Sequence, residues 1–202
     1  MIQGIDVSHH NGAVDWPQVA DAGIQFVYIK ATQGTGYVDP MFVRNLAGAA
    51  AAGIAHGVYH YLSPMAQAAD QAAHFLTTID SKVGQLPPVV DVEPTFADGS
   101  NIDLWSRIPM DERVEKVVKF CEAVRLGSGV NPMIYASPSF VEEMLGSDPR
   151  LGDYDLWIAE YGVSAPRVPK PFADYRCWQH SELGTVAGAG AGVDLDVWNG
   201  EL

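Results

Sequence analysis

The chain has 202 residues, of which 48% are hydrophobic and 18% are charged, and this composition is typical of a folded globular protein rather than a disordered or fibrous one. Its length suits one domain, which we predict to span residues 1–202. The formal net charge of −13 and the absence of a Lys/Arg cluster argue against nucleic acid or an anionic membrane surface as the main partner, because both favour basic patches.

Short β-branched or aromatic runs alternate with helical patterns through the first two-thirds of the chain. We predict strands at residues 4–8, 25–32, 55–63, 87–93 and 132–137. Apolar residues recur at helical spacing between them, which predicts helices at residues 15–23, 39–53, 65–80 and 110–127. Strands that alternate with helices are typical of a parallel sheet built from βαβ units.

The last third of the chain has a different pattern. We predict strands at 155–161, 175–181 and 193–200, but the segments between them are rich in proline or in small residues and do not resemble helices. A parallel neighbour needs a long crossover, so the final strands are expected to be partly antiparallel. Eight strands with about five helices therefore predict an α/β fold, an irregular TIM-like β/α barrel whose last strands lack helices.

Two sequence features bear on the cellular compartment in which the protein acts. Cys121 and Cys177 are expected to be buried free thiols, with a disulfide as the less favoured alternative. No apolar run approaches the length that spans a bilayer, and the first ten residues lack the basic start and apolar core of a signal peptide. The protein then stays inside the cell, has lost a signal, or is delivered by another route.

Asp91 and Glu93 interrupt an otherwise apolar run, LPPVVDVEP at residues 86–94. Side chains alternate along a strand, so the two acids share one face and Val90 and Val92 share the other. In a parallel barrel the acids would point inward at the carboxyl end of their strand, where the active sites of such barrels lie. The alternative is a solvated strand end or a structural salt bridge, but no Lys or Arg is interleaved with the acids.

Two more acids occupy strand ends, Asp6 in the first strand and Asp194 in the last. If the barrel closes, these strands are neighbours and all four carboxylates approach one mouth. Most glycoside hydrolases use two carboxyl groups that flank the bond to be cleaved. Cα atoms two residues apart on a strand are about 6.6 Å apart, and this spacing leaves both inverting and retaining geometries open.

Aromatic side chains also gather near the strand ends, and aromatic rings suit a polysaccharide because they stack on sugar faces. The candidates are Tyr59, Tyr61, Tyr135, Trp157, Tyr161, Trp178 and Trp198. Core packing is the alternative for each of them. Tyr61, at the end of its strand, is the strongest candidate.

Taken together, these motifs resemble one known family. The segments that carry the resemblance run in order from residue 4 to residue 200: GIDVSHHNG, FVYIKATQGTGYVDPMF, AAAAGIAHGVYHYL, PPVVDVEP, MIYAS, LWIAEY, CWQH and VDLDVWNG. They are similar to glycoside hydrolase family 25, the Chalaropsis-type lysozymes. The resemblance implies a β/α barrel whose final strands lack helices. It also implies cleavage of the β-1,4 bond between N-acetylmuramic acid and N-acetylglucosamine in peptidoglycan.

The resemblance also implies roles for individual residues. Glu93 matches the proton donor, and Asp91 matches its companion, which acts on the 2-acetamido group of the substrate or on the developing oxocarbenium charge. Asp6 and Asp194 match acids that line the cleft and tune or orient that pair. The positions that resemble substrate contacts are Lys30, Tyr61, Tyr135, Trp157 and Gln179. Substrate assistance is favoured, and the identity of the nucleophile stays open.

The chain departs from the family pattern in three places. Asp196 stands where relatives often have Asn, which adds negative charge on the same strand face as Asp194. The sequence QHSE replaces a more usual Gln-Tyr-Thr, so the local substrate contacts are expected to differ from those of the family. His9 and His10 are expected to be one surface and one packing histidine.

Two other functions compete with a muramidase. A metal-dependent hydrolase would use Asp6, His10, Asp91 and Glu93 as ligands, but the chain lacks the His-x-His or His-Glu-x-x-His spacing. A non-catalytic glycan-binding module would have little use for four cleft acids. The favoured reading is a monomeric enzyme that needs no metal or cofactor. Its partners are peptidoglycan glycan strands, without nucleic acid or membrane. It would reach the bacterial cell wall by secretion, or as a phage endolysin released through a holin.

Overall fold

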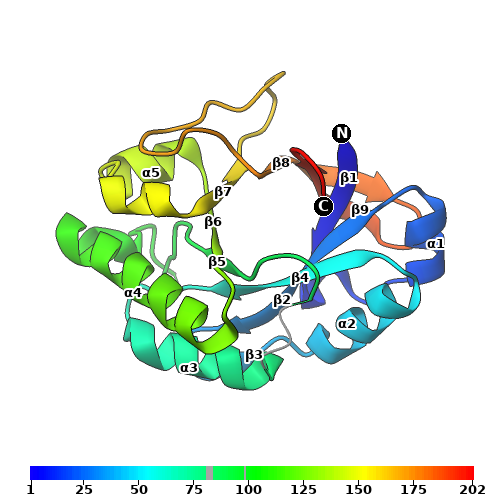
Figure 1. Cartoon of the computed structure of the whole chain (residues 1–202), viewed down its shortest axis with the longest axis horizontal. Coiled ribbons are helices and arrows are strands. Elements are labelled where there is room, and N and C mark those ends of the chain that lie inside the picture. The colour runs from blue at the N-terminus through cyan, green and yellow to red at the C-terminus, as the bar shows by residue number, and fades with distance from the viewer. Residues whose placement is uncertain (81–83, 98) are drawn as a thin grey trace.

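In the described residues, the fold is a closed barrel of eight strands with one extra strand at its edge. The computed structural model describes residues 1–80, 84–97 and 99–202. Its sheet has the order β1-β9-β8-β7-β6-β5-β4-β2-β3, and β1 also pairs with β2, which closes the barrel (Figure 1). The helices lie around the outside of the strands (Figure 1).

The strands confirm the predicted mixed topology. Their bounds are β1 Ile2–Val7, β2 Phe26–Gln33, β3 Tyr37–Val38, β4 Ala55–Tyr61, β5 Val89–Asp91, β6 Met133–Ala136, β7 Asp155–Ala159, β8 Cys177–Val186 and β9 Gly190–Trp198. The barrel strands from β1 through β2 and β4 to β8 are parallel to their neighbours, whereas β9 is antiparallel to both β8 and β1. The predicted irregular barrel with a partly antiparallel end is therefore confirmed.

Among the described residues, five α-helices accompany the strands, which agrees with the predicted number of about five. They are α1 Trp16–Asp21, α2 Phe42–Ala51, α3 Ala68–Ile79, α4 Met110–Ser128 and α5 Pro138–Met144, with three 3-10 turns, η1 His9–Asn11, η2 Leu104–Arg107 and η3 Pro149–Asp153. The sequence pattern does not place α5, because its seven residues are too few to show helical periodicity. Its start is nevertheless encoded: the Ser137 hydroxyl accepts a hydrogen bond from the Phe140 amide, and Pro138 occupies the first turn.

The connection between the last two strands differs from its prediction. Residues 182–192 are expected to be a flexible link, but most of them extend β8 and β9 into one long antiparallel hairpin, paired as far as Val186 and Gly190. Gly188, at φ +89°, lies in the turn. Gly184 is required inside the hairpin, since a Cβ there would lie 2.4 Å from the Leu195 side chain. Small residues here allow close strand packing rather than flexibility.

Side chains on the two faces of the barrel form two separate apolar clusters. The interior cluster contains Phe26, Tyr28, Tyr59, Leu86, Val89, Met133, Tyr135, Trp157, Ala159, Cys177 and Trp198. Val90 and Val92 belong to the other cluster, between strands and helices, as the alternation predicts. Stacking of Trp157 on Tyr28, with ring centroids 4.7 Å apart, helps to fill the interior. The interior below the strand ends is therefore packed with aromatic rings.

Both cysteines are buried free thiols, which confirms the favoured expectation. Cys121 lies on the buried side of α4, and Cys177 lies at the start of β8. In the part of the chain that the structure describes, no helix is both long and apolar enough to cross a membrane.

Candidate active site

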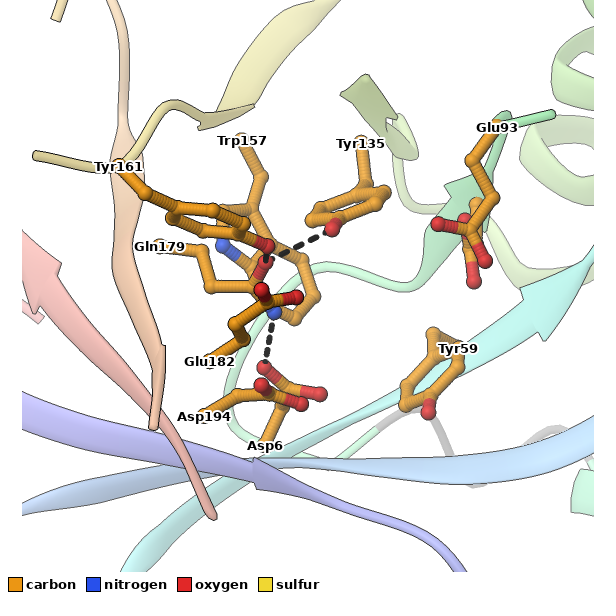
Figure 2. A pocket seen from close by; sticks show the side chains of 10 residues that line it. Asp6, Tyr59, Glu93, Tyr135, Trp157, Tyr161, Gln179, Glu182 and Asp194 are labelled. Atoms are coloured by element: carbon orange, nitrogen blue, oxygen red, sulfur yellow. Dashed lines mark hydrogen bonds between the residues drawn. The ribbon is translucent and has the colours of Figure 1, made fainter. Parts of the chain in front are cut away.

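All four predicted catalytic acids line one pocket (Figure 2). Its lining residues are Asp6, Tyr59, Asp91, Glu93, Tyr135, Trp157, Tyr161, Gln179, Glu182 and Asp194. The cavity is about 190 Å³, far more than the ~30 Å³ that one water occupies in the liquid. Figure 2 shows Glu93 on one side of the pocket and Asp6, Asp194 and Glu182 on the other. The arrangement can therefore place acids on both sides of a bound group.

Asp91 and Glu93 come from the carboxyl end of β5. Asp91 pairs with Tyr61 on β4 and Tyr135 on β6, so its backbone is held from both sides. The carbonyl oxygen of Glu93 accepts a hydrogen bond from the Trp105 indole at 2.9 Å, which holds the chain just beyond the strand. In the described part of the chain, Asp91 Oδ1 is buried and has no hydrogen-bond partner. Asp91 therefore lines the pocket with one oxygen buried beneath the surface and without a donor among the described residues.

The two acids of this pair are biased toward their protonated forms. Burial raises the pKa of Asp91 well above its usual value and the charge of Glu93 adds to this, while Lys30 opposes it. Burial also raises the pKa of Glu93, with Lys30 lowering it and Asp194 raising it further. A carboxyl group whose pKa is raised toward neutrality can act as a general acid.

Asp6 and Asp194 meet because the barrel closes. They are direct partners across the antiparallel pair β1 and β9. Gln179 on β8 donates from Nε2 to Asp6 Oδ2 at 2.7 Å. Burial raises the pKa of Asp6 well above its usual value, any negative charge on Asp196 or Asp194 raises it further, and the Gln179 hydrogen bond lowers it. Burial also raises the pKa of Asp194, to about 6.

Of the five predicted substrate-binding residues, Tyr135, Trp157 and Gln179 line the pocket, whereas Lys30 and Tyr61 are not among its lining residues. The Lys30 ammonium lies 4.8 Å from the centre of the Tyr61 ring and donates to Gln33 at 3.1 Å. The Tyr61 hydroxyl donates to the Pro94 carbonyl at 3.1 Å, just beyond Glu93. The pairing of β2 with β4 also shifts register between Lys30 and Thr32.

Three other aromatic candidates lie in three different surroundings. Tyr161 lines the pocket. Trp178 packs in the outer cluster with its indole on the Glu160 carbonyl, at 2.8 Å. Trp198 lies in the interior cluster and donates to the Glu201 carbonyl at 2.9 Å. Neither tryptophan lines the pocket, so core packing is the better description of both.

Two acids of this region escape the sequence-based list of site residues. Glu182 on β8 lines the pocket, but β8 changes register between Gln179 and Gly184, so strand alternation cannot place it. Asp196 is completely buried. Its only sequence signal is its spacing of two from Asp194.

The histidines at the barrel mouth do not join the acids. His9 Nδ1 lies 2.8 Å from Asp39 Oδ2, and His10 is exposed on η1. Among residues 1–80, 84–97 and 99–202, no cluster of three or more histidine, cysteine or acidic side chains is arranged to hold a metal ion. The proposed ligand set with His10 therefore does not assemble.

The geometry agrees with comparisons to known proteins. The family model for glycosyl hydrolases family 25 matches residues 5–189. The chain is similar to Lysozyme M1 of Streptomyces globisporus, with 33% identity over 98% of this chain and 68% of that protein. It is 36% identical to the protein YegX of Escherichia coli K12, over 100% of this chain and 71% of that protein. The crystal structure of a bacterial lysozyme from Streptomyces coelicolor matches with a TM-score of 0.90 and 32% identity, covering 98% and 92% of the two chains.

Proposed function

Since the chain belongs to glycosyl hydrolase family 25 and is a glycoside hydrolase, we propose that it cleaves the β-1,4 bond between N-acetylmuramic acid and N-acetylglucosamine in peptidoglycan. The observation that carries this proposal is the convergence of Asp6, Asp91, Glu93 and Asp194 on one open pocket. Relatives named as lysozymes support the choice of substrate.

In the proposed mechanism, Glu93 donates its proton to the glycosidic oxygen as the bond from that oxygen to the anomeric carbon breaks. Its raised pKa supports this role, because the group keeps its proton closer to neutral pH. The substrate's own 2-acetamido oxygen then bonds to the anomeric carbon, and Asp91 accepts a hydrogen bond from the acetamido N–H. Water finally attacks the same carbon, the bond from that carbon to the acetamido oxygen breaks, and the water gives a proton to Glu93, which restores the enzyme.

The position of Asp91 supports this division of labour, since it lines the same pocket as Glu93 and comes from the same strand end. We propose that Asp6 and Asp194 tune and orient the pair across the pocket. Tyr135 and Trp157 would form a wall for the sugar, with Tyr61 and Lys30 at its edge. Gln179 is proposed to contact the substrate only at its margin, because its amide already bonds Asp6, Tyr135 and Tyr161.

The proposed substrate puts the site of action at the bacterial cell wall. We propose that residues 1–202 act as one catalytic domain and as a monomer, without a cofactor. Secretion and release of a phage endolysin through a holin are the two proposed routes to the wall.

The direct test is Glu93→Gln, which keeps the size of the side chain and removes its transferable proton. We expect the clearing of a peptidoglycan suspension to fall by roughly 10²–10⁴-fold, the usual contribution of a general acid. Glu112→Gln, at an exposed position in the first turn of α4, is the matched control and should keep wild-type activity. Near-native turnover by Glu93→Gln would show that the assignment is wrong.

The products distinguish the competing functions. Mass spectrometry of the digest should find reducing muramic acid ends, which neither a glucosaminidase nor an amidase produces. Loss of activity on chelation, restored by a divalent ion, would favour a metal-dependent hydrolase instead. Binding to cell walls without new reducing ends would favour a glycan-binding module.

A further inference from the structure

A third carboxyl group lies beneath Asp6 and Asp194, where water does not reach it. Asp196 follows Asp194 by two residues on β9 and is 0% exposed. It is paired with Gly4 on β1 and with Gln179 on β8, so it lies between the two strands that carry Asp6 and its hydrogen-bond donor. Gly4 has no side chain to cover it, and a Cβ there would lie 2.2 Å from the Phe26 ring.

The two oxygens of Asp196 have different surroundings. Oδ1 accepts a hydrogen bond from the Trp157 indole at 2.9 Å and a weak one from the Cys177 thiol at 3.9 Å. Oδ2 is buried and has no hydrogen-bond donor in the part of the chain that the structure describes. A carboxyl oxygen that accepts nothing in a dry site is the natural place for the proton, because a protonated carboxyl group can itself donate.

In the part of the chain that the structure describes, no positive charge balances this carboxyl group. The titratable groups that interact with it from the neighbouring strands are Asp6 on β1, Asp194 on β9, Cys177 on β8 and Tyr28 on β2, and in the described residues none of them is a cation. The Lys30 ammonium acts on Asp91 and Glu93 instead. An unpaired buried carboxylate is costly, and such a group usually takes up a proton.

We propose that Asp196 stays protonated throughout the pH range of activity and is a positioning residue: its Oδ2 hydroxyl donates to the Asp6 carboxylate while its Oδ1 accepts from Trp157. Asp6 then receives two donors, this hydroxyl and the Gln179 amide, and Trp157 in the pocket wall is tied to Asp6 through one side chain. No proton is transferred. The importance of Asp6 for activity rests on the function proposed above, but the protonation of Asp196 does not.

Burial raises the pKa values of both Asp196 and Asp6, which favours a proton on this pair, and the geometry decides which of the two groups holds it. Burial raises the pKa of Asp196 well above its usual value, and the charge of Asp194 also raises it. Hydrogen bonds with Trp157, Asp6 and Cys177 lower this pKa. Asp6 is the better site for the negative charge because it lines the pocket and accepts the Gln179 amide hydrogen.

The protonation state can be measured without an activity assay. In protein labelled with ¹³C at the aspartate Cγ, one resonance should keep the chemical shift of a protonated carboxyl group from pH 5 to pH 8 and should be missing from Asp196→Asn. If no resonance assigned to Asp196 behaves in this way, and its shift at pH 7 is that of a carboxylate, the proposal is overturned. This result holds whether or not Glu93 proves to be the acid.

Two variants then test the positioning role. Asp196→Leu has a similar size but neither accepts nor donates, so we expect kcat/KM to fall at least tenfold and its acid limb to move to higher pH, because Asp6 loses a donor. Asp196→Asn can accept with Oδ1 and donate with Nδ2, and should rescue most of the activity with the wild-type pH profile. A shift of the Asp196→Asn profile to lower pH would reveal that a negative charge had been removed and would overturn the proposal. A wild-type rate and pH profile in Asp196→Leu would also overturn the proposal. If Asp196→Leu fails to fold, the pH profile of Asp196→Asn and the NMR measurement still test the proposal.

Discussion

Gln179 and Asp6, which are 173 positions apart in the sequence, are joined by a 2.7 Å hydrogen bond that spans β9 from β8 to β1. The ionised Asp6 carboxylate has no hydrogen to donate, so the Nε2 of the amide faces it. The amide Oε1 then accepts from the hydroxyls of Tyr135 at 2.7 Å and Tyr161 at 2.5 Å. Figure 2 shows this chain of bonds across the pocket floor.

Replacing this amide should change the pH dependence of the enzyme. The Gln179 hydrogen bond lowers the pKa of Asp6, so Gln179→Met should raise that pKa and move the acid limb of kcat/KM to higher pH. A hydrogen bond to a charged group contributes about 1.5–3 kcal/mol, and we therefore expect kcat/KM to fall by roughly tenfold or more. A pH series of initial rates on soluble peptidoglycan fragments measures both effects.

Tyr161→Phe is the matched control for Gln179→Met. It removes one of the two hydroxyls that donate to Gln179 Oε1 and leaves the hydrogen bond from Gln179 to Asp6 in place. We expect a smaller loss and an unmoved acid limb. If both variants shift the limb equally, the hydrogen bond to Asp6 is not the cause.

The sequence predicts those parts of the site that depend on strand alternation and barrel closure. Alternation puts Asp91 inside and Val90 outside, and both lie as expected. Closure makes the first and last strands neighbours, which brings Asp6 beside Asp194. These relationships follow from the period of a strand and need no knowledge of individual contacts.

Other parts of the site depend on irregularities that leave no periodic signal. Register shifts along β8 decide that Glu182 reaches the pocket, and a shift in β2 lies beside Lys30. The fifth helix, α5, is too short to show a period. The depth of Asp196 depends on the pairing of β9 with both neighbours, because the spacing of two fixes its face but not its burial.

Lys30 should set the position of the pH optimum. Its charge lowers the pKa values of both Asp91 and Glu93, so Lys30→Met should raise both. The acid limb, which requires both Asp91 and Asp6 to be ionised, and the alkaline limb, which requires protonated Glu93, should then both move to higher pH. Because Lys30 is also a proposed substrate contact, we expect kcat/KM to fall about tenfold at the wild-type optimum, on the order of one hydrogen bond to a charged group.

The control for Lys30→Met is Lys30→Arg, which keeps the positive charge and should keep both limbs in place. The Lys30 ammonium is nearly buried beside the Tyr61 ring, so the larger guanidinium can lower the rate without moving the profile. A Lys30→Met profile that moves to lower pH, or whose limbs do not move, would contradict this account.

Asp194 should make the folded protein less stable as the pH rises. Burial raises its pKa to about 6 in the folded state, against about 3.9 for an unperturbed aspartate. Between these two values the folded state holds a proton that the unfolded state has lost, so the free energy of unfolding falls as the pH rises through this window and stays lower above it. Asn does not titrate, and Asp194→Asn should therefore be more stable than wild type above pH 6 and nearly equal at pH 4.

Thermal melts from pH 4 to pH 8 provide the measurement, and the quantity to plot is the difference in Tm between Asp194→Asn and wild type. Because Asp194 is partly exposed, solvent screening reduces the gain to the order of 1 kcal/mol, or about 2–4 °C for a chain of this size. His60 is buried with a pKa lowered to about 3 and destabilises the fold at acid pH, but it does so in both proteins and cancels in the difference. The charge of Asp194 also raises the pKa values of Asp6 and Asp196. Its removal in Asp194→Asn lowers those two pKa values, and this also favours the variant over wild type as the pH rises. A difference in Tm that is constant with pH, or a less stable variant at pH 8, would show that ionised Asp194 does not destabilise the folded protein.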